Sequence, residues 1–101
     1  MNLKIHDKDV NFLCDAVLQL RDREECQRFF EDVCTISEIK AMAQRMAVAR
    51  MLYRKAVYTD IVNETGASTA TISRVNRALQ YGCDAYTMLF ERLGEGEDLD
   101  S

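Results

Sequence analysis

Four cysteines and one histidine are the residues of this 101-residue chain best suited to bind a metal or to act as nucleophiles. The cysteines stand at positions 14, 26, 34 and 83, so no two of them form the close CxxC pair of a metal or redox site. His6 has no second histidine with which to share a zinc ion, and its place near a terminus argues against a Cys–His pair or a serine triad. We therefore expect no enzyme activity, no metal and no cofactor, with the thiols acting as small, buried or partly buried hydrophobic groups.

A different chemistry is indicated by residues 66–74, GASTATISR, which place hydroxyl groups and an arginine at a predicted helix start. The preceding residues, YTDIVNET, have the pattern of a short helix that runs directly into the glycine. Free backbone N–H groups and the helix dipole at such a start favour phosphate, and short side chains can approach base edges closely. The stretch is therefore suited to contact with DNA.

The net charge of −4 argues against nucleic acid until the charges are sorted by position. Residues 40–81 carry seven basic and two acidic residues, a net charge of +5, whereas the rest of the chain carries −9. The basic residues of this segment are Lys40, Arg45, Arg50, Arg54, Lys55, Arg74 and Arg77. Because the local pattern governs where a polyanion can dock, the segment is a candidate DNA-binding surface. The alternative is a set of solvated helix faces.

The elements that position these residues are all predicted to be helices, because the chain has no proline and its apolar residues recur at helical spacing. No apolar run approaches the roughly 18 to 20 residues that a membrane helix needs, and no secretory signal is seen, so we expect a cytoplasmic protein. We expect one domain over residues 1–93. Residues 94–101 are acidic and carry glycine, and we expect them to be a disordered tail.

Three helices are predicted before the YTDIVNET helix. The first begins near Asp7 or Asp9, ends around Arg21–Asp22, and carries an apolar stripe of Val10, Leu13, Cys14, Val17 and Leu20. The second runs from about Arg23 to Val33 and buries Phe29, Phe30 and Val33. The third, capped by Thr35 or Ser37, extends from Ile39 to Tyr53. Because it is apolar nearly all round, we infer an obligate dimer with this helix near the interface. The alternative is a central helix wrapped by its own chain.

A helix-turn-helix is predicted over about residues 59–80. Thr59 caps a helix that ends at Thr65, Gly66 provides the tight turn, and Ser68 caps a second helix that ends near Gln80. The apolar contacts between the two helices are assigned to Ile61, Ala67, Ile72 and Val75. The residues expected to point outward are Ser68, Thr69, Ala70, Ser73 and Arg77. A closing helix is expected over residues 84–93, with Ala85, Met88, Leu89 and Leu93 at helical spacing.

The sequence GASTATISRVNRAL resembles the recognition-helix signature of the Trp repressor family, which carries the pattern G-A-x-x-A-T-I-[ST]-R. Upstream, TISEIKAMAQRMAVARMLY is similar to the long helix of that family and its cap, so the likeness covers roughly residues 35 to 80. The further pattern SRVNRALQYG with Tyr86 resembles the YerC/YecD branch of Trp-repressor-like proteins. The resemblance implies an all-helical, intertwined homodimer that presents two helix-turn-helix units to successive major grooves of operator DNA.

Site residues also follow from this resemblance. The positions that meet bases in the family fall here on Thr69, Ala70 and Ser73, and those that contact phosphate fall on Thr71 and Arg77. We add Ser68 and Lys55 as DNA-binding candidates because of their places at the helix start and in the basic segment. For each residue the alternative is a structural role, such as solvation of the helix or an ion pair with an acidic neighbour.

Members of the family that bind tryptophan hold the indole between two arginines that match Arg45 and Arg74, and a threonine that contacts the ligand carboxylate matches Thr35. Where those proteins have a glycine, this chain has Val75, and one fewer residue separates Tyr53 from Ile61. The branched side chain of Val75 would occupy the indole space. We therefore expect L-tryptophan not to be a strong corepressor. A different small anion, no ligand at all, or structural ion pairs for the two arginines remain alternatives.

These observations predict a sequence-specific DNA-binding transcriptional regulator that acts as a repressor on a double-stranded operator. The alternative from another class is a helical protein-interaction module without DNA binding, which the acidic remainder of the chain favours. Basic residues that flank the predicted recognition helix favour DNA.

Overall fold

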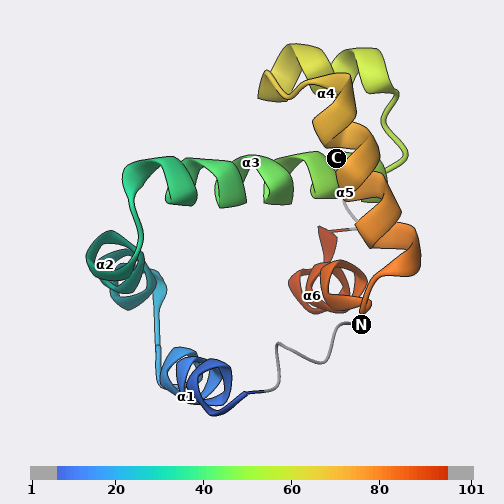
Figure 1. The fold of residues 1–101 in the computed structure, drawn as a ribbon. Coiled ribbons are helices and arrows are strands. Elements are labelled where there is room, and N and C mark those ends of the chain that lie inside the picture. The colour runs from blue at the N-terminus through green and yellow to red at the C-terminus, as the bar shows by residue number, and fades with distance from the viewer. Residues whose placement is uncertain (1–6, 96–101) are drawn as a thin grey trace. The chain divides into compact units, whose positions relative to one another are not determined.

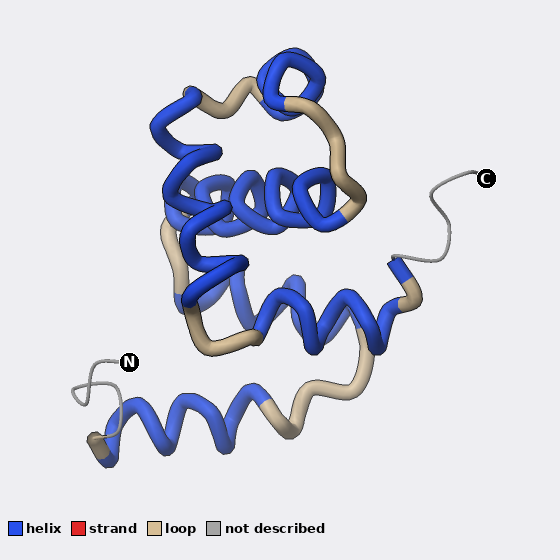
Figure 2. The backbone as a smooth tube through the Cα atoms, turned by 90° about the vertical axis from the view of Figure 1, so that its right-hand side faces the viewer, coloured by secondary structure: helices blue, strands red, loops and turns tan. Residues whose placement is uncertain are grey.

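The computed structural model describes residues 7–95, which form six α-helices and no strand (Figure 1). The helices are α1 (Lys8–Val17), α2 (Arg23–Val33), α3 (Ile36–Tyr53), α4 (Tyr58–Thr65), α5 (Thr69–Tyr81) and α6 (Ala85–Leu93). Only loops and turns connect them (Figure 2). None of the described helices is long and apolar enough to cross a membrane. The prediction of an all-helical fold is confirmed.

The chain divides between Ile39 and Lys40, inside α3, into two compact units. The first unit contains α1, α2 and the first residues of α3. The second contains the rest of α3 together with α4, α5 and α6. The single domain over residues 1–93 stays a prediction, because two compact units can belong to one domain.

Aspartates cap the two helices of the first unit. The carboxylate of Asp7 accepts from the Val10 backbone N–H at 2.8 Å, and that of Asp22 accepts from the Glu25 N–H at 2.8 Å. Asp22 has extended backbone angles, so the chain must leave the helical conformation before it reaches this residue. The prediction that the first helix ends around Arg21–Asp22 was therefore wrong, since α1 ends at Val17. The predicted bounds of the second helix are confirmed.

The apolar side chains of the first unit are largely exposed within one chain. Neither α1 nor α2 contains a buried residue. The burial predicted for Phe30 and Val33 was wrong, because their side chains are 37% and 61% exposed, and Phe29 is only partly buried. The other large exposed apolar residues of this unit are Phe12, Leu13, Val17, Leu18 and Ile36. The helical spacing identified the apolar side of each of these helices, but the described part of one chain does not cover those sides.

The first turn of α3 is closed by a reciprocal pair of hydrogen bonds. The Thr35 hydroxyl oxygen accepts from the Glu38 N–H at 3.1 Å, and the Glu38 carboxylate accepts from the Thr35 N–H at 2.8 Å. These bonds lower the pKa of the Glu38 carboxyl, the backbone bond from Thr35 being the larger cause. Thr35 is thus the cap rather than Ser37, and α3 begins at Ile36, three residues before the predicted start.

The second unit is built around one hydrophobic core to which all four of its helices contribute. The buried residues are Val48, Ala49, Ile61, Ala67, Ile72, Val75 and Phe90. Figure 1 shows α4 and α5 near the C-terminal end of α3, with α6 after the end of α5. Tyr53 and Tyr86 pack on Phe90, with ring centroids 5.2 and 6.1 Å from its own. The core therefore fixes α4 and α5 against the end of α3.

The connection from α5 to α6 depends on a glycine. A Cβ atom at Gly82 would collide with the backbone carbonyl oxygen of Ala78, one turn earlier in α5. The Gly82 N–H donates to that same oxygen at 2.9 Å, which closes α5. The predicted closing helix is confirmed as α6.

The residues after α6 are part of the described structure as far as Glu95. Gly94 ends α6 in the left-handed conformation, with φ at 73°. The carboxylate of Glu95 accepts from Arg54 Nη2 at 2.5 Å, its carbonyl oxygen accepts from Arg54 Nε at 3.1 Å, and Arg50 Nε lies 3.9 Å from the carboxylate. A disordered tail starting at residue 94 was therefore wrong for these two residues. Residues 96–101 lie outside the described residues.

The four thiols are less buried than expected. Cys26 and Cys34 are partly buried, whereas Cys14 and Cys83 are exposed. Cys14 lies on the apolar side of α1 that one chain leaves open, and Cys83 lies in the loop between α5 and α6. The burial prediction was thus wrong for Cys14 and Cys83. His6 lies outside the described residues.

Candidate nucleic-acid interface

The turn between α4 and α5 is held by a glycine and a threonine. Gly66 caps α4 with φ at 72°, a backbone conformation that glycine adopts without a steric cost, and its N–H donates to the Val62 carbonyl at 2.9 Å. The Thr65 hydroxyl donates to the Ile61 carbonyl at 2.6 Å and accepts from the Ala67 N–H at 3.1 Å. The predicted position of the tight turn is confirmed.

Gln44 fixes this turn to α3. Its side-chain amide donates to the Thr65 carbonyl oxygen at 3.1 Å across 21 residues of sequence. Neither Gln44 nor Thr65 was identified as a positioning residue from the sequence. A polar residue within the apolar run of α3 was the available signal for Gln44, and a hydroxyl residue directly before the glycine was the signal for Thr65.

The four residues predicted to form the apolar contacts between α4 and α5 are buried. Ile61 and Ile72 are 0% exposed, and Ala67 and Val75 are 2% exposed. All four belong to the core of the second unit, together with Val48 and Ala49 of α3. This prediction is confirmed. The opposite face of α5 is therefore the one available to a partner.

The start of α4 differs from the prediction. Val57, with extended backbone angles, caps the helix without any side-chain hydrogen bond, and its carbonyl accepts from the Ile61 N–H at 3.2 Å. Thr59 is the second residue of α4, so it was wrong as a cap. A turn at Lys55 connects the end of α3 to Val57, and α4 begins directly after it, at Tyr58.

Lys55 has a positive φ of 68°, in the left-handed region that favours glycine. Its N–H donates to the Leu52 carbonyl at 3.0 Å, and the Ala56 N–H donates to the Met51 carbonyl at 2.9 Å. This is the hydrogen-bond pattern of a Schellman motif, which closes α3 with a lysine where glycine is usual. The side chain of Lys55 is exposed.

The first turn of α5 is capped by Ser68, as predicted. The Ser68 hydroxyl accepts from the Thr71 N–H at 3.1 Å and donates to the Thr71 hydroxyl oxygen at 3.0 Å. Ser68 is therefore occupied as a cap. Thr71 accepts the Ser68 proton, so its own O–H remains available to donate outward.

The remaining DNA-binding candidates lie on the exposed face of α5. Thr69, Ala70, Ser73 and Arg77 are all exposed. Ser73 follows Thr69 by four residues and Ala70 by three, and Arg77 follows Ser73 by four, so they lie along one side of the helix. Within residues 7–95 the ion pairs of Arg50 and Arg54 with Glu95 are present, and neither Lys55 nor Arg77 forms one. The structure thus brings four candidates together, with Lys55 in a separate turn before α4.

The candidate ligand residues Thr35, Arg45 and Arg74 make no hydrogen bond or ion pair with one another within residues 7–95. Arg45 and Arg74 are exposed and form no ion pair within the described part of the chain. Thr35 belongs to the first unit and accepts a hydrogen bond in the cap of α3. Val75 is buried in the core rather than turned toward solvent beside Arg74. These residues stay predictions as a ligand site.

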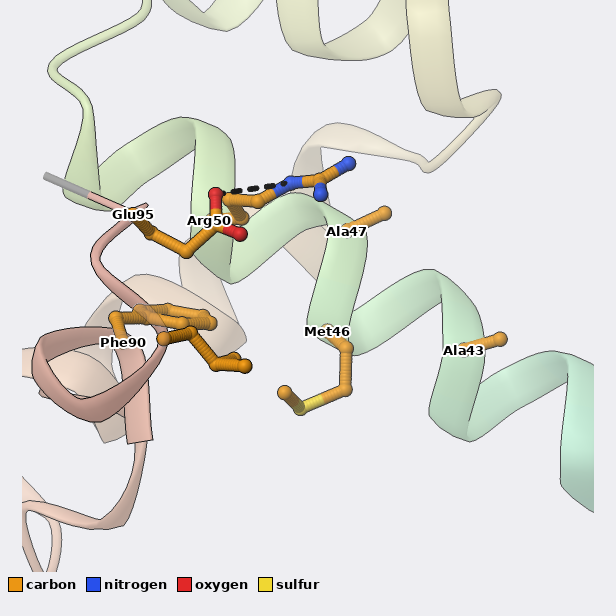
Figure 3. Close-up of a pocket in the computed structure, with 7 residues that line it drawn as sticks. Ala43, Met46, Ala47, Arg50, Phe90 and Glu95 are labelled. Carbon is orange, nitrogen blue, oxygen red and sulfur yellow. Dashed lines mark ion pairs between the residues drawn. The ribbon is translucent and has the colours of Figure 1, made fainter. Parts of the chain in front are cut away.

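A surface pocket of about 320 Å³ lies between α3 and α6 (Figure 3). Its apolar lining comes from Ala43, Met46, Ala47, Phe90 and Leu93, with Arg50 and Glu95 at one end. The side chains of Met46 and Leu93 are 37% and 65% exposed. The second unit therefore also carries uncovered apolar surface.

Comparison with known proteins agrees with this architecture. The family model of the Trp repressor protein matches residues 8–94. The uncharacterized protein YerC of Bacillus subtilis (strain 168) is 54% identical over 94 residues, which cover 93% of this chain and 90% of that protein.

Two solved structures are also similar. A TrpR-like protein from Eubacterium eligens has a TM-score of 0.89 and 55% identity over 92% of this chain and 96% of its own. A crystal structure of a candidate Trp repressor from Staphylococcus aureus has a TM-score of 0.87 and 49% identity over 90% of this chain and 91% of its own. The family is one of regulators rather than enzymes. On its sequence and its fold, this chain belongs to the Trp repressor family.

Proposed function

We propose that this protein is a sequence-specific DNA-binding transcriptional regulator that acts as a repressor in the cytoplasm, with α4 and α5 as its helix-turn-helix. The observation that carries the proposal is the exposed face of α5. Short polar side chains and Arg77 lie on that face, while the opposite face is locked into the core by Ile72 and Val75. A rigid helix with small residues near its start can enter a major groove and bring those residues to base edges.

The proposed roles differ along this face. Thr69, Ala70 and Ser73 contact base edges, because they are short, exposed and close to the start of α5. Thr71 donates its free hydroxyl proton to phosphate. Arg77 contributes a cation to phosphate, as does Lys55 from the turn before α4. Ser68 supports the site through the cap and makes no direct contact with bases.

The active form is proposed to be an intertwined homodimer. Its support is the exposed apolar surface of α1, α2 and the pocket between α3 and α6, including Phe12 at 74% and Leu18 at 78% exposure. Surfaces of this kind mark protein interfaces. Two copies then present two α5 helices to half-sites about 34 to 36 Å apart on one face of the DNA.

The experiment that tests DNA binding compares the wild type with the double variant Lys55→Ala, Arg77→Ala. Fluorescence anisotropy with a labelled duplex gives the affinity at several salt concentrations. We expect the wild type to lose affinity steeply with salt, and the double variant to bind all sequences more weakly and with a smaller salt slope. Asn63→Ala, which changes an exposed residue of α4, is the matched control. Equal binding by the double variant and the wild type at low salt would favour the protein-interaction module instead.

A further inference from the structure

A second surface cavity lies where the start of α4 meets the C-terminal half of α5. Its volume is about 280 Å³, and its lining residues are Tyr58, Ser73, Asn76, Arg77, Gln80 and Tyr81. Four of these residues were not among the predicted DNA contacts. Tyr81 is 82% exposed, which is unusual for an aromatic side chain without a partner.

The chemistry of the lining favours an anion with several acceptor oxygens. Every lining residue carries at least one hydrogen-bond donor, Arg77 is a permanent cation, and no carboxylate lines the cavity. The amide of Gln80 donates to the Asn76 amide oxygen at 3.4 Å, which occupies that acceptor and leaves the Asn76 NH₂ group free to donate. The neutral groups of the cavity can donate as well as accept, and its one full charge is the positive charge of Arg77, which suits phosphate rather than a cation.

The position of the cavity fits the geometry of DNA. Ser73 and Arg77 belong both to the predicted DNA-contacting face of α5 and to the cavity lining. Gln80 follows Ser73 by seven residues, or about 10 Å along the helix. The major groove is about 12 Å wide, so a site this far from the base-contacting turn can reach the strand that borders the groove.

We propose that this cavity binds a DNA backbone phosphate, held by Arg77 together with the neutral donors Tyr58, Asn76, Gln80 and Tyr81. This inference rests on the proposed function and adds to it a phosphate site composed mainly of uncharged groups. Such a site fixes the register of α5 in the groove, because hydrogen bonds depend on direction more strongly than a mobile surface charge does.

The test uses single variants of the full chain and a mixed-sequence duplex of about 30 base pairs, long enough for two half-sites one turn apart. Tyr58→Phe and Gln80→Ala each remove neutral donors, so each should weaken binding about 5- to 10-fold without changing the salt slope. Arg77→Ala should weaken binding and lower the slope by about one for each copy in contact with DNA. Asn63→Ala should bind like the wild type. Melting curves check that every variant is folded.

Duplexes that carry a binding site selected from random sequence fix the register, and a neutral methylphosphonate at one backbone position at a time then locates the phosphate. One position in each half-site should weaken binding by the wild type, and the same substitution should have little further effect on the double variant Tyr58→Phe, Gln80→Ala. If Arg77→Ala binds duplex DNA more weakly than the wild type but Tyr58→Phe and Gln80→Ala bind with wild-type affinity, the cavity proposal is overturned while DNA binding stands. If the wild type does not bind duplex DNA at low salt, both the cavity proposal and the proposed function are rejected.

Discussion

Replacing Lys55 by glycine should stabilise the fold and weaken DNA binding at the same time. Lys55 holds a φ of 68°, and the left-handed conformation costs an L-residue about 1 to 2 kcal/mol. Glycine removes this strain but gains backbone freedom in the unfolded chain, which offsets about 0.4 to 1 kcal/mol. We therefore expect a net stabilisation between about 0 and 1.6 kcal/mol, and the midpoint of about 0.8 kcal/mol corresponds to a rise in Tm of about 3 to 6 °C.

Lys55→Ala is the matched control for this experiment. It removes the same charge and most of the same side chain but keeps the strained backbone, so its Tm should stay close to that of the wild type. Both variants should bind duplex DNA equally weakly, with a salt slope reduced by about one for each copy that contacts DNA.

Thermal unfolding at one fixed protein concentration and anisotropy titrations over a salt series measure the two effects. A glycine variant no more stable than the alanine variant would show that the turn at Lys55 carries no strain. Wild-type DNA binding by both variants would show that Lys55 does not contact phosphate.

Three further predictions concern α5, α3 and the ligand. Gly82→Ala should lower the free energy of unfolding by about 1 to 3 kcal/mol, because the new Cβ meets the Ala78 carbonyl; thermal melts check this, and wild-type stability would contradict it. Glu38→Gln should lower Tm at neutral pH and lose this effect as the pH falls through the lowered pKa of Glu38, since a depressed carboxyl pKa stabilises the fold only while the group is charged. A Tm difference that is constant across the acid range would exclude this role. Millimolar L-tryptophan should leave Tm unchanged, because Val75 replaces the glycine of tryptophan-binding relatives and is predicted to occupy the indole space, whereas a ligand at about 100 times its Kd would add about 2.7 kcal/mol and several degrees. A clear rise in Tm would contradict it.

Local signals in the sequence predicted most of the structure of α4, α5 and the turn between them. Ser68 and Gly66 mark the ends of two helices through their side-chain and backbone chemistry, and Ile61 and Ile72 follow the helical period, so the structure agrees at all four positions. These features depend on residues close in sequence. Other local features were missed: Thr59 is not the cap of α4, α1 ends before Arg21, and the lysine at position 55 gives no signal of a left-handed backbone.

Features that depend on distant contacts were not predicted. Glu95 was read as part of a disordered tail from its acidic neighbours, yet it pairs with Arg54 across 41 residues of sequence. The helical period identified the apolar sides of α1 and α2 but not what covers them, so the burial of Phe30 and Val33 was predicted wrongly for one chain. A period reports which side of a helix avoids water and not which chain provides the contact.

Selection of binding sites from random-sequence duplexes tests most directly whether α5 reads DNA. The wild type should enrich a near-palindrome whose half-sites lie about 34 to 36 Å apart, one turn of the double helix. Ser73→Ala should enrich a motif with relaxed preference at one position in each half-site, while Asn63→Ala should enrich the wild-type motif. Enrichment of no motif by the wild type at low salt would contradict the proposal that this protein is a sequence-specific regulator.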